Sequence, residues 1–289
     1  MSQRVLVTGG HGFLGSWVSR GLAQHGLRVE VPSRRELDVT EASHWDRLPA
    51  GFDAVVHAAA YVPASPTRPE DVANAIEVGA RGTHLALEWA AGRRVTRFVY
   101  CSSADVYARG GPIPVPERAA LEPSGAAVYY GLGKLWGEQL ARAMRGADRL
   151  GTVSLRFAQL HGHGMRPRGV VAAFVDRARR GEAMLVNAPD ASGDFLYVAD
   201  AVQAVVQALS AAAPGPVYNI GSGAETTLVE LATAVWGAFR SDPPRIEVGE
   251  QEGVRFALDV GKARAELGYS PAFDLARGLA DWKTLEGAH

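Results

Sequence analysis

A tyrosine and a lysine four positions apart, Tyr130 and Lys134, are the residues of this chain whose types and spacing best suit chemistry. On a helix, residues four apart share one face, so the phenol and the ammonium would lie side by side. A neighbouring ammonium favours the phenolate and lowers the phenol pKa, which is about 10 when unperturbed. We therefore expect Tyr130 to act as a general acid or base near neutral pH.

A glycine-rich loop near the start of the chain predicts the binding of a nucleotide cofactor. Gly9, Gly12 and Gly15 follow an apolar run at 5–7, which indicates a buried strand, and precede a helical pattern at 14–25. In this context the first glycine allows a tight turn, the second lets backbone approach a pyrophosphate, and the third lets the helix pack on the strand. The pyrophosphate would lie at the helix N-terminus.

The residues that follow the second predicted strand, at 29–31, indicate which nicotinamide cofactor is used. An Asp or Glu at this point holds the ribose 2′-hydroxyl of NAD, whereas this chain has Ser33 and Arg34. A hydroxyl and a guanidinium suit a 2′-phosphate, so we expect NADP, with NAD as the alternative. Two competing interpretations are that Arg34 is an ordinary solvated charge and that Glu30, between two valines, is the ribose-binding acid.

Strand-like and helical segments alternate along the chain, which predicts an α/β fold with a doubly wound parallel sheet. Further strands are expected at 54–58, 98–102, 152–157 and 217–220, and helices at about 72–91, 129–145, 170–180 and 227–239. We expect residues 1–160 and about 194–222 to form a dinucleotide-binding domain. Residues at about 161–193 and 223–289 would form a smaller substrate-binding lobe over the carboxyl ends of the strands.

The composition excludes several classes of function. The 289 residues carry a formal net charge of −1 with no basic stripe, so nucleic acid is not expected as a partner. No apolar run approaches the roughly 20 residues of a membrane helix, and strand-like sequence from residue 4 leaves no room for a signal peptide. The single cysteine, Cys101, lies in an apolar run and indicates a buried thiol in a reducing cytoplasm.

Several segments, in order and spacing, resemble the motifs of the extended short-chain dehydrogenase/reductase family, especially its sugar-nucleotide epimerases, dehydratases and reductases. They lie at 8–15 (the glycine loop), 37–40, 56–60, 102–107, 130–134 (Tyr-x-x-x-Lys), 193–200 and 218–223. The resemblance covers nearly the whole chain and implies a Rossmann domain. It also implies that Ser103 is the catalytic hydroxyl, which would hydrogen-bond the reacting oxygen beside Tyr130 and Lys134.

The same resemblance implies the binding residues. Cofactor contacts are expected from Gly9, Gly12, Phe13, Leu14, Gly15, Ser33, Arg34, Asp38, Val39, Ala58, Ala59, Ala60, Ser102, Tyr130, Lys134 and Phe157. Substrate contacts are expected from Ser103, Asp105, Tyr130, Gln159 and Arg255. Asp105 is equally well interpreted as a turn cap, and Arg255 as a surface charge. No metal site is expected, because His161 and His163 have no third ligand nearby.

Four residues depart from the family pattern. Gly79 stands where an Asn is usual, Gly133 where a Ser is usual, Gln159 where an Asn often contacts the substrate nucleotide, and Gly193 where an Arg is usual. The related 4,6-dehydratases carry an Asp-Glu pair after the catalytic hydroxyl, and this chain has Ala104 and Asp105 there. Because Ala cannot transfer a proton, dehydratase chemistry is not expected.

The leading functional hypothesis is a 4-ketoreductase that delivers hydride from NADPH to C4 of a nucleotide-diphosphate sugar. A 4-epimerase with tightly bound NAD is the first alternative, and a reductase of a small non-nucleotide carbonyl is the second. A non-catalytic nucleotide-sensing protein is a remote third. We also expect a homodimer, because the helices at 72–91 and 129–145 resemble those that pair in this family, with Ala86, Leu87, Trp89 and Ala90 as apolar surface.

Overall fold

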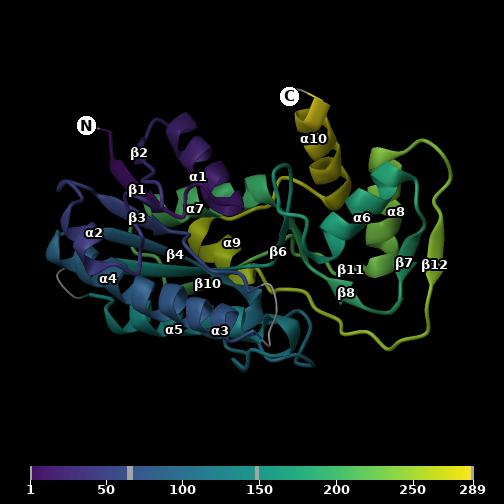
Figure 1. Ribbon diagram of the computed structural model, residues 1–289, viewed down its shortest axis with the longest axis horizontal. Helices are drawn as coiled ribbons and strands as arrows, with labels where there is room; N and C mark the ends of the chain where they lie inside the picture. Colours follow the sequence, from purple (N-terminus) through teal and green to yellow (C-terminus); the bar gives the residue numbers. More distant parts are fainter. Residues whose placement is uncertain (1, 64–67, 147–149, 288–289) are drawn as a thin grey trace.

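A six-stranded parallel sheet forms the centre of the molecule (Figure 1). The computed structural model describes residues 2–63, 68–146 and 150–287. The strands are β1 (Arg4–Thr8), β2 (Arg28–Glu30), β3 (Ala54–His57), β4 (Arg97–Ser103), β5 (Gly151–Phe157) and β10 (Val217–Ile220), in the order β10-β5-β4-β3-β1-β2. The order reverses between β1 and β3, and ligands of such sheets bind at the carboxyl ends of the strands beside this point. The predicted doubly wound sheet is confirmed.

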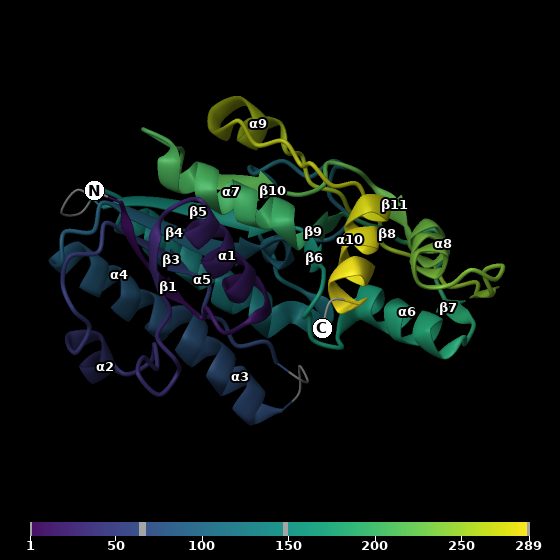
Figure 2. The same ribbon diagram turned by 90° about the horizontal axis from the view of Figure 1, so that it is seen from above.

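Helices cover both faces of the sheet, which explains why the strands are continuous apolar runs (Figure 2). One face carries α1 (Phe13–Gln24), α7 (Val198–Ser210) and the short α9 (Gly261–Leu267). The other carries α2 (Ala42–Asp46), α3 (Pro69–Ile76), the π-helix η1 (Glu77–Gly82), α4 (Thr83–Gly92) and α5 (Val128–Ala143). Side chains of β1 alternate between the two resulting cores: Val5 and Val7 face α1 and α7, and Leu6 faces α4.

The rest of the chain forms a second, smaller body beside the sheet (Figure 1). It contains α6 (Gly169–Arg180), α8 (Leu228–Phe239) and α10 (Leu275–Gly287), with the strand pairs β7 (Met184–Val186) with β12 (Ile246–Val248) and β8 (Ser192–Gly193) with β11 (Thr226–Thr227). Phe174, Trp236 and Trp282 lie in its separate core. The strands β6 (Gln159–His161) and β9 (Phe195–Tyr197) pair where the two bodies meet. Within the range expected to form the lobe, α9 instead packs on β10 and α7.

The apolar residues expected to form a dimer surface are buried inside the subunit. Ala86, Leu87 and Ala90 are fully buried and Trp89 is 7% exposed, all in the core between the sheet and α4. The sequence argument that they offer free surface is therefore wrong, because all four side chains lie on the face of α4 that packs into this core. Large apolar side chains that are exposed on the same side of the molecule are Ile76 on α3 and Trp136 on α5.

The two glycine departures at 79 and 133 face one another where η1 crosses α5. A Cβ atom on Gly79 would lie 2.6 Å from the Cα of Gly133, and a Cβ on Gly133 would lie 2.9 Å from the carbonyl oxygen of Ala75. Neither the usual Asn nor the usual Ser fits at this separation. The expected single helix at 72–91 is interrupted by the π-turn of η1 at this same crossing. The two departures are thus one structural feature, a direct backbone contact between helices.

We predict that Gly79→Ala lowers the free energy of unfolding by about 1–3 kcal/mol, the usual range for an overpacked contact. Gly237→Ala is the matched control, because Gly237 lies inside α8 with nothing within 4 Å of the position of its Cβ. This control should raise stability by up to about 1 kcal/mol through helix propensity. Denaturant unfolding measures both changes, and equal stability of the two variants would contradict the close contact.

Candidate functional site

Ser103, Tyr130 and Lys134 come together at the carboxyl end of β4. Ser103 is the last residue of β4, and Tyr130 and Lys134 lie in the first two turns of α5. The Ser103 hydroxyl hydrogen-bonds the Tyr130 phenol, and Lys134 Nζ lies 5.6 Å from the centroid of the Tyr130 ring. Lys134 Nζ donates a 2.6 Å hydrogen bond to the carbonyl oxygen of Cys101. The predicted catalytic set is therefore one contiguous cluster.

Burial changes the two pKa values in opposite directions. It raises the pKa of the Tyr130 phenol above its ordinary value, with the nearby Asp105 carboxylate as the next cause, and the Ser103 hydrogen bond lowers it. Burial also lowers the pKa of the Lys134 ammonium to about 8. We expected Lys134 to lower the phenol pKa, and in the structure that expectation is wrong, because the ammonium donates to a backbone carbonyl and burial dominates. Tyr130 is a neutral acid here, able to donate a proton.

The glycine loop between β1 and α1 is shaped to hold a phosphate. Gly9 has φ +68°, and a Cβ there would lie 2.5 Å from the backbone nitrogen of Ala59. A Cβ on Gly15 would lie 2.2 Å from the carbonyl oxygen of Gly9. Gly12 is the N-cap of α1 and has no side-chain cap, so the first N–H groups at Phe13 and Leu14 receive no such partner. This cradle fits a dinucleotide pyrophosphate.

Other expected cofactor residues line the same edge of the sheet. Ala58, Ala59 and Ala60 follow β3, Ser102 is the last residue but one of β4, and Phe157 ends β5. Ser102 is buried and donates to the Glu138 carboxylate at 2.5 Å, so its hydroxyl is held by the protein itself. Val39 is also buried and packs under Gly82.

The turn after β2 presents a guanidinium and no free acid. Arg34 is 82% exposed and pairs with Asp38 at 3.2 Å. Burial acts to raise the Asp38 pKa, but hydrogen bonds from Thr40 and Arg34 outweigh it and hold the pKa below its usual value. Glu30 ends β2, and its carboxylate is taken by Arg4 at 2.5 Å. The competing acid for a ribose hydroxyl is thus already paired.

The predicted substrate residues are distributed around this cluster, each with protein partners. Asp105 is the middle residue of the 3-10 helix η2 (Ala104–Val106), where its backbone N–H donates to Ser103 Oγ at 3.1 Å and its carboxylate pairs with Arg109 at 2.9 Å. Gln159 is exposed on β6. Arg255 is 62% exposed and forms a two-point pair with Glu225 at 2.7 and 2.8 Å. Substrate phosphate at Arg255 would have to compete with Glu225.

His161, at the end of β6, and His163, in the loop that follows, are not arranged as a metal site. His161 is buried against the Tyr197 ring, with centroids 5.5 Å apart, and the His163 carbonyl accepts a hydrogen bond from the Trp17 indole. In the described part of the chain, no group of three or more His, Cys, Asp or Glu could hold a metal ion. No helix among the described residues is both long and apolar enough to cross a membrane.

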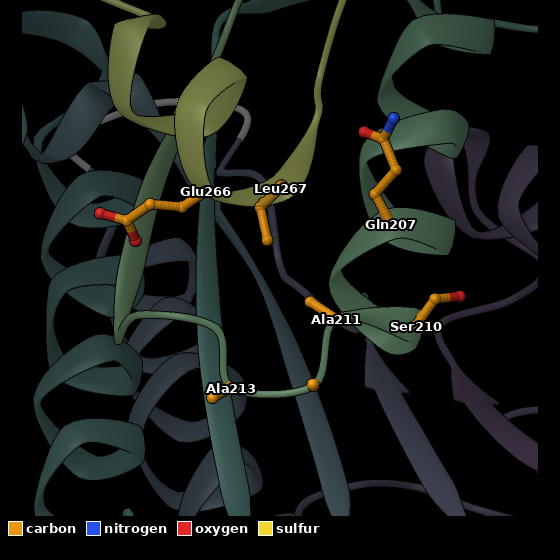
Figure 3. A pocket seen from close by; sticks show the side chains of 7 residues that line it. Gln207, Ser210, Ala211, Ala213, Glu266 and Leu267 are labelled. Carbon is orange, nitrogen blue, oxygen red and sulfur yellow. The ribbon is translucent and has the colours of Figure 1, made fainter.

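Two cavities differ sharply in their relation to the cluster. One of about 10 Å³ lies beside Lys134 and Tyr130, between η1 and α5, and has room for about one water molecule. A much larger one of about 440 Å³ lies between the end of α7 and α9 (Figure 3). Gln207, Ser210 and Glu266 line it, and the loop at 211–213 that leads into the amino end of β10 closes it. It contains none of the predicted site residues.

Sequence reasoning missed a charged pair directly behind the cluster. Glu138 on α5 and Arg156 on β5 form a bidentate ion pair, with 2.6 Å as its shortest distance and side chains 5% and 4% exposed. Two signals were present in the sequence. Glu138 repeats the four-residue spacing of Tyr130 and Lys134, and Arg156 interrupts an otherwise uncharged strand.

The fold and the cluster define a nicotinamide-dependent oxidoreductase of the short-chain type. The chain belongs to the NAD dependent epimerase/dehydratase family, whose model matches residues 5–221. It is 29% identical to a dTDP-glucose 4,6-dehydratase of Streptomyces niveus, over 96% of this chain and 91% of that one. It is also 29% identical to a UDP-glucose 4-epimerase of Mycolicibacterium smegmatis, over 98% and 97%. The UDP-glucose 4-epimerase of Thermotoga maritima, solved with UDP-glucose, superposes with a TM-score of 0.86 at 26% identity, over 99% of both chains.

Proposed function

We propose that this enzyme reduces the C4 carbonyl of a nucleotide-diphosphate 4-keto sugar, with NADPH as the reductant. The observation that carries the proposal is the Ser103–Tyr130–Lys134 cluster at the carboxyl edge of β4, beside the phosphate cradle of α1. The nicotinamide, when bound, supplies the hydride. Family membership and relatives that act on nucleotide sugars support the substrate class.

The residues of the cluster divide the remaining work. Tyr130 gives its phenolic proton to the C4 oxygen, because burial keeps the phenol protonated at neutral pH. Ser103 already hydrogen-bonds the phenol and would bind the same substrate oxygen, which fixes its distance from the proton donor. Lys134 stabilises the phenolate that forms, and the Cys101 carbonyl holds its ammonium in place.

A 4-epimerase is the second candidate, and the comparisons support it directly. Both the Mycolicibacterium relative and the Thermotoga structure are UDP-glucose 4-epimerases. The same residues would serve it only with Tyr130 starting as the phenolate, which would take the proton from a C4 hydroxyl and return it after the keto sugar turns over. We do not propose 4,6-dehydration, because the family's acid position is Ala104, a buried side chain without an exchangeable proton.

We predict that Tyr130→Phe lowers kcat by about 10²–10⁴-fold, the usual contribution of a general acid, with cofactor affinity nearly unchanged because the ring remains. Tyr129→Phe is the matched control and should retain activity. The assay follows nucleotide 4-keto sugars with NADPH, and nucleotide hexoses with NAD. A reductase oxidises one NADPH per product, whereas an epimerase interconverts sugars with no net oxidation. More than about a tenth of wild-type kcat in Tyr130→Phe would refute the acid role.

We predict tighter binding of NADPH than of NADH, through Ser33 and Arg34. Arg34→Ala should weaken NADPH binding by about 10- to 150-fold, since a charge-assisted hydrogen bond contributes about 1.5–3 kcal/mol, and should leave NADH binding unchanged. Arg35→Ala, the neighbouring exposed arginine, serves as the control. Fluorescence titration with both cofactors measures the affinities. Tighter NADH binding by the wild type would overturn the NADP assignment.

We also propose that the enzyme is a homodimer that pairs through the outer face of α3 and α5. Ile76 and Trp136 expose 45% and 54% of their surface there, and burial of such side chains is a favourable term in association. Light scattering should give twice the 30.7 kDa chain mass, and Trp136→Glu should give the monomer. Val248→Glu changes an equally exposed residue of the lobe, 55% exposed, and should remain dimeric. Monomeric wild type at micromolar concentration would exclude the dimer.

A further inference from the structure

The helix that carries Tyr130 and Lys134 carries a third polar residue on the same face. Glu138 lies four positions after Lys134 and is 5% exposed. One carboxylate oxygen accepts from Ser102 Oγ at 2.5 Å and from Arg156 Nε at 2.9 Å, and the other accepts from Arg156 at 2.6 and 3.1 Å. The carboxylate therefore ties α5 to β4 and β5 together.

Arg156, like Glu138, has several hydrogen-bond partners within the protein. It pairs in the sheet with Ser102, the residue before the catalytic Ser103. Its guanidinium also donates to the Tyr107 phenol at 2.8 Å and to the carbonyl of Glu117 at 2.9 Å. Tyr107 in turn donates to Asn219 at 2.6 Å. Each nitrogen of the Arg156 guanidinium therefore donates to a protein group, which stabilises a buried charged pair.

Stability alone does not account for such a pair. Removing both charges from water costs free energy that their mutual attraction offsets only when the geometry is good, and apolar replacements are often equally stable. The position of the pair suggests a role in the site. Glu138 lies about one helical turn after Lys134, and Arg156 pairs in the sheet with Ser102, the residue before Ser103.

We propose that Glu138 and Arg156 are positioning residues: their ion pair fixes α5 against β4 and β5, and the Glu138 carboxylate one turn from Lys134 favours the ammonium form of that side chain. This inference rests on the proposed catalytic role of Lys134. Burial lowers the Lys134 pKa to about 8, and the Cys101 thiol and the Glu138 carboxylate act in the opposite direction.

The other groups that face this region from the neighbouring elements do not replace that field. Burial keeps His57 on β3 neutral by lowering its pKa to about 3, and raises the Cys101 thiol pKa to about 12 and the Tyr100 pKa well above its usual value. On the side of α3 and η1, the lining residues Ala75 and Gly79 carry no charge. Asp105 on η2 faces Tyr130 and is paired with Arg109. Glu138 is thus the carboxylate that acts on Lys134, and the guanidinium of Arg156, its partner on β5, acts against it.

The chain offers a direct test, because its sequence contains only three lysines, Lys134, Lys262 and Lys283. Lysine labelled with ¹³C at Cε gives three NMR signals, which Lys262→Arg and Lys283→Arg assign. We expect Glu138→Gln to lower the Lys134 pKa by about one unit, in line with the loss of a nearby opposite charge. The pH at which kcat/KM falls on the alkaline side of its profile should decrease by the same amount.

Tyr107→Phe is the matched control, since it removes a hydroxyl of the same network and leaves both charges. It should lower the melting temperature and leave the Lys134 titration unchanged. If Glu138→Gln does not fold, the double variant Glu138→Gln with Arg156→Met removes both buried charges and should still lower the Lys134 pKa. An unchanged Lys134 titration in a folded Glu138 variant, or an equal shift in Tyr107→Phe, would overturn the proposal.

The titration needs no substrate, so it separates this inference from the proposed function. An active Tyr130→Phe enzyme would refute the catalytic assignment whatever Lys134 does. The Lys134 pKa could also shift while the alkaline side of the kcat/KM profile stays in place. Glu138 would then set the charge of Lys134, but this charge would not limit the reaction. That result would overturn the positioning role.

Discussion

The close approach of α5 to the sheet is the constraint on which the rest of the structure depends. Three glycines permit it. A Cβ on Gly137 would lie 2.1 Å from the Tyr100 phenol oxygen, one on Gly131 would lie 2.4 Å from the Asp105 carbonyl, and Gly133 touches Gly79. Because the backbone of α5 lies directly against β4 and η2, Lys134 reaches the Cys101 carbonyl and is buried. A helix displaced outward by one side-chain layer would leave the ammonium in water and Tyr130 apart from Ser103.

That burial has a cost, and the surrounding residues offset it. An ammonium in a poorly solvated site is destabilised, and the structure surrounds it with a carbonyl dipole, a tyrosine ring at 5.2 Å and the carboxylate of Glu138. The same burial keeps the Tyr130 phenol protonated. The protonated Tyr130 phenol and the buried Lys134 ammonium therefore both follow from the close packing of α5 against the sheet. The nucleotide loop meets this site because β1 and β4 end at the same edge of one parallel sheet.

Members of this family share the central chemistry and differ in what surrounds it. The relatives of this chain include a 4,6-dehydratase and 4-epimerases at similar identity, so overall likeness does not select among outcomes. Our proposal therefore rests on local features of this chain: Ala104 after Ser103, the Ser33–Arg34 turn after β2, and Arg255 paired with Glu225.

The order of motifs along the chain by itself determined the parallel sheet, the phosphate cradle and the Ser103–Tyr130–Lys134 set, because these depend on local patterns and fixed spacings. Helix α7 escaped prediction, since its alanines and valines are apolar on most sides and continue from β9 without a side-chain cap. The surface expected at Ala86, Leu87, Trp89 and Ala90 proved to be core. The sequence marked Glu138 by its spacing and Arg156 by its charge, but only the tertiary structure paired them. The Gly79–Gly133 contact and the direction of the Tyr130 pKa also came from the structure alone, because contact and desolvation between residues far apart in sequence are not specified by local patterns.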